Sequence, residues 1–202
     1  MRSALRQDYT SSNTCRLSIL ICGLPIEDRM ANLSLLYKKL NNQKIGRSVE
    51  IIVLTDFKDM SVGEKRNLLV QMATGDYVVF IDDDDDISDD YIITILNAAE
   101  SNPCVVSIKQ FQTTEGINRT LVDFSINHGR NYNVRGERRM IPNHTCAVRR
   151  EIAKRHPFDH INLSEDHKFA VNILPELTNE VCIDKVIYFY KFSRTTSQTR
   201  GR

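Results

Sequence analysis

The stretch Gly75-Asp76-Tyr77-Val78-Val79-Phe80-Ile81-Asp82-Asp83-Asp84-Asp85-Asp86 joins a short apolar segment directly to five consecutive aspartates. Residues 77–81 are apolar without alternation, mostly β-branched or aromatic, which is typical of a strand buried on both faces. Five like charges repel one another, and a solvated acidic loop is the alternative for such a run. Ligands bind at the carboxyl ends of strands in open α/β sheets, and clustered carboxylates suit a divalent ion that shares its shell with phosphates. The stretch therefore predicts a metal–phosphate site.

Strands and helices alternate around this stretch. Short apolar runs predict strands, and apolar residues at helical spacing predict helices between them. Ser61, with Glu64 three residues later, and Ser88 are the expected helix N-caps. The alternation predicts an α/β fold with a parallel sheet and helices on both of its faces. The expected strands are residues 17–22, 49–54, 77–81 and 104–109, and the expected helices are residues 28–40, 62–73 and 89–100.

The pattern is less regular after Gln110. Residues 112–139 are polar and basic, which indicates loops or a small antiparallel excursion. A strand is expected at residues 140–148 and a short helix at 149–155. A helix capped by Ser164 is expected at residues 165–174, and a final strand or strand pair at 181–192. We expect one domain over residues 15–194, after a flexible lead-in at 1–14 and before a polar basic tail at 195–202.

The composition is that of a soluble globular protein, with 41% hydrophobic and 26% charged residues in a chain of 202. A net charge of +1 argues against a general nucleic-acid binder. No apolar run approaches the roughly 18 residues of a spanning helix, and the N-terminus lacks the apolar core of a signal peptide. Cys22, Cys104, Cys146 and Cys182 are expected to be small buried hydrophobes in a reducing compartment. The expected location is the cytoplasm.

Three segments of the chain resemble the family 2 glycosyltransferases. They are Gly63-Glu64-Lys65-Arg66-Asn67, the stretch from Gly75 to Asp85, and Ser164-Glu165-Asp166. The resemblance runs from about residue 17 to 190. It implies the GT-A fold, a Rossmann-like three-layer α/β/α sandwich with a mostly parallel central sheet. It also implies transfer, with inversion, from a UDP- or GDP-linked sugar to a hydroxyl of a glycan or similar acceptor.

The resemblance assigns roles within the acidic run. Its Asp-x-Asp carboxylates would be Asp82 and Asp84, which would hold Mn²⁺ or Mg²⁺ against the donor diphosphate. Asp82 would also face the nucleotide-sugar. Asp83 is also a candidate nucleotide-sugar-binding residue, because the family's motif can be aligned with the five aspartates in registers that differ by one residue. Asp86 is interpreted as part of a solvated turn.

Other expected site residues lie outside the run. Asp56 matches the family's acid that contacts the nucleotide base, with an ordinary loop aspartate as the alternative. Lys65 and Arg66 fall in the first turn of a helix, where the helix dipole disfavours cations. That position indicates an anionic partner, either the donor diphosphate or the acidic run, with a solvated helix face as the alternative.

The chemistry of transfer indicates a base. In the resembling enzymes the aspartate of the late pair, here Asp166 beside Glu165, deprotonates the acceptor hydroxyl. The alternative is a pair of acids that complement the helix dipole. His144 is a candidate to hydrogen-bond the donor or acceptor or to complete the metal shell, with a structural histidine as the alternative.

The chain also departs from the family pattern. Cys22-Gly23-Leu24-Pro25 replaces the usual Pro-Thr-Tyr-Asn after the first strand, and the chain has no tryptophan, which excludes the processive subgroup with its Gln-x-x-Arg-Trp. Two other functions remain open. One is a nucleotidyltransferase, although its expected Gly-rich loop has a single glycine here. The other is a non-catalytic carbohydrate- or nucleotide-binding module. The sugar, acceptor and oligomeric state are left open.

Overall fold

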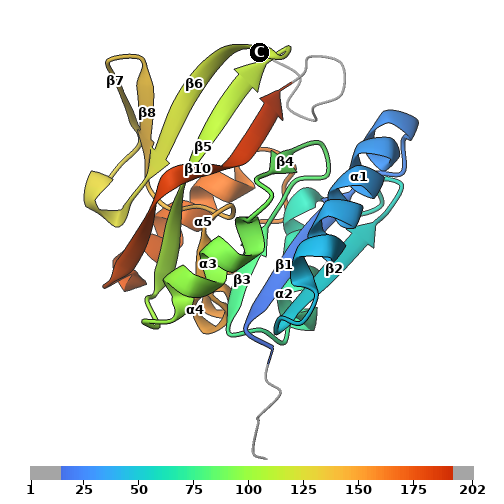
Figure 1. Ribbon diagram of the computed structural model, residues 1–202, viewed down its shortest axis with the longest axis horizontal. Helices are drawn as coiled ribbons and strands as arrows, with labels where there is room; N and C mark the ends of the chain where they lie inside the picture. The colour runs from blue at the N-terminus through green and yellow to red at the C-terminus, as the bar shows by residue number, and fades with distance from the viewer. Residues whose placement is uncertain (1–14, 193–202) are drawn as a thin grey trace, which may run out of the picture.

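The computed structural model describes residues 15–192, and Figure 1 shows a twisted sheet covered by helices. Within these residues, ten strands form one sheet in the order β2-β1-β3-β9-β5-β6-β8-β7, with β10 beside β5 and β4 beside β10. The predicted lead-in at 1–14 and tail at 195–202 lie outside the described residues. No helix within residues 15–192 is long and apolar enough to cross a membrane.

The first half of the sheet is parallel. Strand β1 (Leu17–Gly23) lies between β2 (Val49–Thr55) and β3 (Tyr77–Phe80), and Leu17 is in register with Val49 on one side and Tyr77 on the other. Helices α1 (Glu27–Lys44) and α2 (Val62–Met72) make the crossovers. Right-handed crossovers between parallel strands place helices against the sheet, and both helices contact these strands.

The second half of the sheet is mixed. Strand β9 (Ala147–Arg149) is antiparallel to both β3 and β5 (Val105–Thr114), so it joins the two halves. Strand β5 pairs with β6 antiparallel and with β10 parallel. The remaining strands are β4 (Asp86–Ile87), β6 (Ile117–Phe124), β7 (Tyr132–Val134), β8 (Glu137–Met140) and β10 (Glu180–Phe192).

Helices cover both faces of the parallel half, which makes three layers. Helix α1 contacts α3, and both lie on the near face in Figure 1, whereas α2 contacts α4 and α5 behind the sheet. The core lies between these layers and includes Ile19, Val79 and Ile95, all fully buried. The remaining helices are α3 (Tyr91–Ala99), α4 (Arg150–Arg155) and α5 (Glu165–Ile173), with 3₁₀ turns η1 (Ile126–His128) and η2 (Leu174–Glu176).

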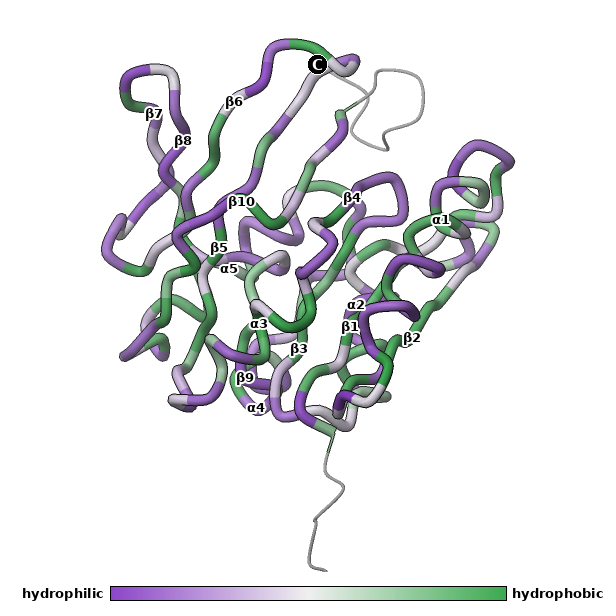
Figure 2. Tube along the Cα trace, in the orientation of Figure 1, coloured by the Kyte–Doolittle hydropathy of each residue, from purple (hydrophilic) through white to green (hydrophobic). Residues whose placement is uncertain are grey.

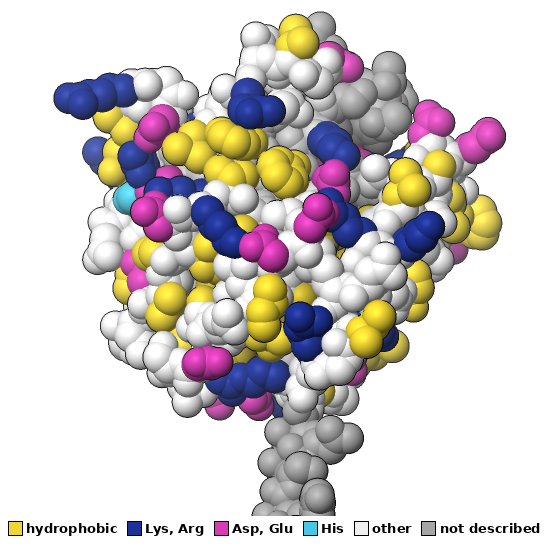
Figure 3. All heavy atoms as spheres, in the orientation of Figure 1, with side chains coloured by type: hydrophobic (Ala, Val, Ile, Leu, Met, Phe, Trp, Pro, Cys, Tyr) yellow, Lys and Arg dark blue, Asp and Glu magenta, His cyan; other side chains and the backbone are white. Residues whose placement is uncertain are grey.

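The two halves also differ in polarity. In Figure 2 the parallel strands are hydrophobic over most of their length, whereas the β7–β8 hairpin is largely hydrophilic. In Figure 3, hydrophobic side chains gather over β5, β6 and β10 on the face shown. By strand register Phe111 lies beside both Leu121 and Phe189, and all three side chains are half-buried. The opposite face of these same strands lines the cavity described below.

The predicted α/β architecture is confirmed, and so is the capping box of Ser61 and Glu64. Of the two alternatives for residues 112–139, the antiparallel excursion is the one observed, in the pairs β5–β6 and β7–β8, although β6 pairs with β8 in parallel. The strand expected at residues 140–148 was wrong, because β8 ends at Met140 and residues 141–146 connect it to β9 as a buried loop.

Two predicted helix caps were also wrong. Helix α3 starts after Asp90, and the Ser88 hydroxyl donates to the Asp90 carboxylate instead of capping the helix. Ser164 precedes α5 as predicted, but it has left-handed backbone angles (φ 67°) and makes no capping hydrogen bond. The expectation that four cysteines are buried holds fully only for Cys146, since Cys182 is exposed on β10.

Candidate active site

A cavity of about 250 Å³ lies at the carboxyl ends of the parallel strands. It is lined by Asp82 and Asp84 from the acidic run, by Glu165 and Asp166 from the start of α5, and by His144 from the loop before β9. These residues come from three segments that are far apart in the sequence. The fold therefore brings together the two acidic pairs that the sequence singled out.

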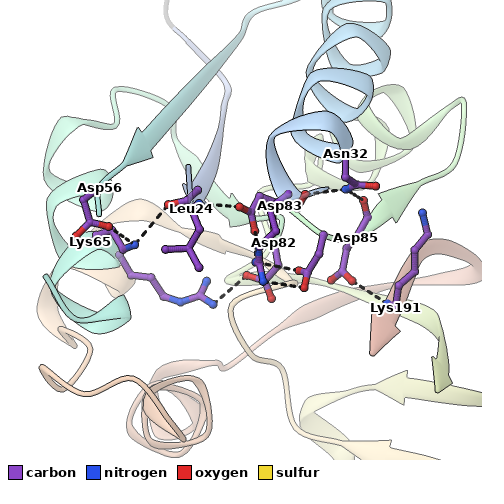
Figure 4. A network of polar contacts seen from close by, with 12 residues as sticks. Leu24, Asn32, Asp56, Lys65, Asp82, Asp83, Asp85 and Lys191 are labelled. Carbon is purple, nitrogen blue, oxygen red and sulfur yellow. Dashed lines mark hydrogen bonds and ion pairs between the residues drawn. The ribbon is translucent and has the colours of Figure 1, made fainter. Parts of the chain in front are cut away.

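The side chains of the acidic run point alternately toward the cavity and away from it. Asp83 is fully buried and accepts hydrogen bonds from Arg29 Nε (2.8 Å) and from the backbone nitrogen of Leu24 (2.8 Å). Asp85 is buried as well and accepts from Tyr188 Oη (2.6 Å) and the backbone nitrogen of Lys191 (2.8 Å). Figure 4 shows both anchored carboxylates. Neither lines the cavity, so these two carboxylates hold the run in place while Asp82 and Asp84 face the cavity.

Arg29 also reaches Asp84, although the sequence did not single it out. Its Nη1 and Nη2 lie 3.0 Å and 3.2 Å from the two Asp84 oxygens. Burial, together with the nearby charges of Asp82 and Asp83, raises the pKa of Asp84 to about 6 despite Arg29. For Asp82 the net effect is opposite: burial raises its pKa, but Arg66 (3.1 Å), His144 and Arg29 together outweigh burial and hold the pKa well below its usual range.

The fit of a divalent ion depends on these two carboxylates. Within the described residues, no group of three or more His, Cys, Asp or Glu side chains is arranged to hold a metal ion. Burial and the neighbouring carboxylates Asp82 and Asp83 disfavour the charged form of Asp84, and a bound cation would favour it. Magnesium-like ions commonly take one or two carboxylates and complete their shell with water and substrate phosphates. Asp82 and Asp84 fit that kind of site.

Lys65 and Arg66 are both buried, so the alternative of a solvated helix face is excluded. Lys65 Nζ donates to Asp56 (2.6 Å), whose other oxygen accepts from the Met60 nitrogen (2.8 Å). Burial works against this charge, yet these hydrogen bonds hold the pKa of Asp56 below its usual value. Lys65 lines the cavity, whereas Asp56 does not, and Figure 4 shows the Asp56 carboxylate next to the Lys65 amine.

Arg66 links the two acidic pairs. Its Nη2 contacts Asp82 (3.1 Å) and its Nε lies 3.4 Å from Glu165. The guanidinium lies over the rings of Phe80 (4.9 Å) and Phe158 (5.7 Å), an arrangement that favours a cation. Its Nη1 is buried and makes no hydrogen bond within the described residues. The acidic run is therefore one anionic partner of Arg66, as the sequence had left open.

The glycine and asparagine of the 63–67 segment position the loop before α5. A Cβ at Gly63 would lie 1.8 Å from the Asp159 carbonyl oxygen, so only glycine permits this close approach. The Asn67 side chain exchanges two hydrogen bonds of 2.8 Å with the backbone of Phe158. Both contacts hold this loop against α2, and α5 then begins at the cavity.

His144 lies between the two acidic pairs. Its Nε2 is 3.6 Å from Asp82 and its Nδ1 is 3.9 Å from Asp166, and neither nitrogen makes a hydrogen bond within the described residues. Asp166 is the more accessible acid of its pair, with 37% of its side chain exposed, whereas Glu165 is buried against Arg66. Burial raises the pKa of Glu165, and Asp166 adds to the effect while Arg66 opposes it.

The opposite side of the cavity was not predicted. We call the residues at the parallel strand ends (Arg29, Lys65, Arg66, Asp82, Asp84) the strand-end wall. The strand-face wall consists of Gln110, Gln112, Phe124, Arg138, Met140 and Tyr190 from β5, β6, β8 and β10. The alternation Gln110-x-Gln112 was a sequence signal for one face of a strand, but residues 112–139 were interpreted as loops or a small antiparallel excursion.

Comparison with known proteins agrees with the fold. Residues 1–349 of S. aureus TarS in complex with UDP align with a TM-score of 0.65 and 15% identity, covering 89% of this chain and 61% of that one. The complex of the same TarS fragment with UDP-GlcNAc aligns with a TM-score of 0.63 and 14% identity, covering 88% and 58%. The chain thus spans about three-fifths of these structures. No curated protein sequence matches it.

A sequence comparison identifies the family. The family described as "Glycosyl transferase family 2" matches residues 50–156, which is more than half of the chain. The matched region contains the 63–67 segment, the acidic run and His144. This chain belongs to glycosyl transferase family 2.

Proposed function

We propose that this chain transfers a sugar, with inversion, from a UDP- or GDP-linked donor to a hydroxyl of a glycan or similar acceptor. One observation carries the proposal: in a family 2 chain, Asp82 and Asp84 line the same cavity as Glu165 and Asp166. One pair suits a metal-bound diphosphate, and the other suits a general base. All five cysteines are free, which supports the cytoplasm as its location.

The strand-end wall would bind the donor. Lys65, held by Asp56, and the buried Nη1 of Arg66 offer donor groups at the cavity. The complexes of TarS with UDP and UDP-GlcNAc support a uridine nucleotide there. Asp82 and Asp84 would hold Mn²⁺ or Mg²⁺, which when bound supplies Lewis-acid assistance to the leaving diphosphate.

Asp166 would take the proton of the acceptor hydroxyl. An alcohol is a poor nucleophile until its proton leaves, and a positioned carboxylate accepts that proton as the oxygen attacks the anomeric carbon. The bond from that carbon to the diphosphate breaks as the new bond forms. Because the hydroxyl approaches opposite the leaving group, the product has the inverted configuration. Glu165, buried beside Arg66, would orient the start of α5.

Calorimetry with UDP and GDP, with and without Mn²⁺, tests the proposal. Wild-type protein should bind one nucleotide only when the ion is present, and Asp84→Asn should weaken that binding at least about tenfold, since one charged ligand is lost. Asp86→Asn is the matched control, because Asp86 lies in the same run but contacts Lys39 and Lys191 away from the cavity. Unchanged Mn²⁺-dependent affinity in Asp84→Asn would contradict the metal assignment.

A further inference from the structure

The strand-face wall presents one side of four neighbouring strands. Successive side chains of a strand point to opposite faces, so Gln110 and Gln112 share a face of β5. Tyr190 on β10 is in register with Gln112, and Arg138 on β8 is in register with Val122 on β6. The wall therefore combines two amides, an arginine and a half-buried tyrosine ring beside the acids of the cavity.

Arg138 differs from the other arginines and lysines that line the cavity. Lys65 pairs with Asp56, Arg66 with Asp82 and Glu165, and Arg29 with Asp83 and Asp84. Arg138 donates to the neutral amide oxygen of Gln112 (2.7 Å), and the described residues offer it no carboxylate.

The next residue on the same strand makes the contrast clear. Arg139 points to the opposite face, where it pairs with Asp123 and Glu137 (2.7 Å for Glu137). Adjacent arginines on one strand thus have opposite environments: one is neutralised by two acids, and the other faces a cavity with its charge unmatched. A guanidinium in that setting suits a planar or tetrahedral oxyanion, to which it can donate two hydrogen bonds.

A second feature of this wall indicates a polar ligand. The Gln110 side chain is buried, lines the cavity, and its Oε1 makes no hydrogen bond within the described residues. A buried amide oxygen without a partner costs free energy, which a ligand hydroxyl would recover. Together with the ring of Tyr190, this amide suits a sugar whose hydroxyls donate and whose ring packs on the aromatic face.

We propose that the strand-face wall is the acceptor subsite and that it selects an acceptor with an acidic group. Arg138 binds the carboxylate or phosphate of that acceptor, and Gln110 accepts from one of its hydroxyls. This inference rests on the proposed function, and it adds the chemical class of the acceptor. The donor diphosphate is the other possible anion for Arg138, and the test separates the two.

Matched pairs of probes give the test. Binding of methyl β-D-glucuronide and methyl β-D-glucoside, and of glycerol 3-phosphate and glycerol, is measured by ligand-observed NMR with saturating UDP and Mn²⁺ and again without them. In wild-type protein the acidic member of at least one pair should bind with roughly tenfold or more higher affinity than its uncharged counterpart, because a charged hydrogen bond usually contributes about that much. Arg138→Gln should remove that preference.

Arg139→Gln is the control, because it removes the same charge from the opposite face of the same strand, and the preference should persist. UDP affinity should be equal in wild type and both variants. Equal binding of acidic and neutral probes by wild-type protein would overturn the inference, as would a preference that survives in Arg138→Gln. A loss of UDP affinity in Arg138→Gln would assign the residue to the donor instead. Failure of the proposed function would show separately, as no Mn²⁺-dependent nucleotide binding by wild-type protein.

Discussion

The two walls of the cavity are built in different ways. On the strand-end wall, every cation already has a carboxylate partner, as Lys65 has in Asp56 and Arg29 in Asp83. On the strand-face wall, Arg138 has only an amide partner, and the Gln110 oxygen has none within the described residues. The difference indicates that the positive charges of the first wall are paired before any ligand arrives, whereas the second keeps an arginine that no carboxylate of the described residues pairs. Three further predictions test this contrast.

The largest effect is expected for Asp166→Asn, in the first turn of α5, which belongs to neither wall. If Asp166 is the base, transfer should fall by about 10²–10⁴, the usual worth of a positioned proton acceptor. Binding of donor and metal should remain, because the strand-end wall is untouched. Transfer is measured with an acceptor that the wild-type protein binds, and nucleotide binding is measured by calorimetry.

Asp89→Asn is the control for this variant, since Asp89 is almost fully exposed and pairs only with Lys39 in the described part of the chain. Near-wild-type transfer by Asp166→Asn would contradict the assignment. An NMR-determined product with the donor's anomeric configuration would do so more strongly, because an inverting base would then have no role.

A loss of stability is expected for Arg29→Met. This change leaves the fully buried Asp83 carboxylate without its cation, and removing one partner of a buried pair costs about 3–5 kcal/mol. The double variant Arg29→Met/Asp83→Asn should recover much of that loss, because the buried charge is then gone. Urea unfolding of both variants gives the comparison. If the single variant is as stable as wild type, the strand-end wall does not depend on this pair.

The smallest of the three effects is expected for Asp56→Ala. Asp56 does not line the cavity but orients Lys65, which does, so its loss should weaken donor binding in the ground and transition states alike. The donor KM should rise about tenfold while kcat changes little, as for the loss of one charged hydrogen bond. Lys65→Ala should behave in the same way. A large fall in kcat with unchanged KM would instead place the pair in the chemical step.

Whether a feature could be predicted from the sequence depends on how far apart in the chain its interacting residues lie. Ser61 and Glu64 are three residues apart, so their capping box could be predicted from a local pattern. The sequence also indicated that carboxylates follow a buried strand, but not that alternate carboxylates face opposite ways. That alternation depends on Arg29, which is 54 residues from Asp83, and on Tyr188, which is 103 residues from Asp85. Contacts at such separations have no local periodicity.

The sequence alone determined the alternating elements, the parallel half of the sheet and the acids of the cavity, because apolar periodicity and short motifs report on neighbouring residues. Only the tertiary structure decided which aspartates face the cavity, that His144 lies between Asp82 and Asp166, and that Gln110 and Arg138 share its far wall. These features arise where strands from the two halves meet in one sheet. Strand pairing and burial set them, and neither is encoded by any one segment.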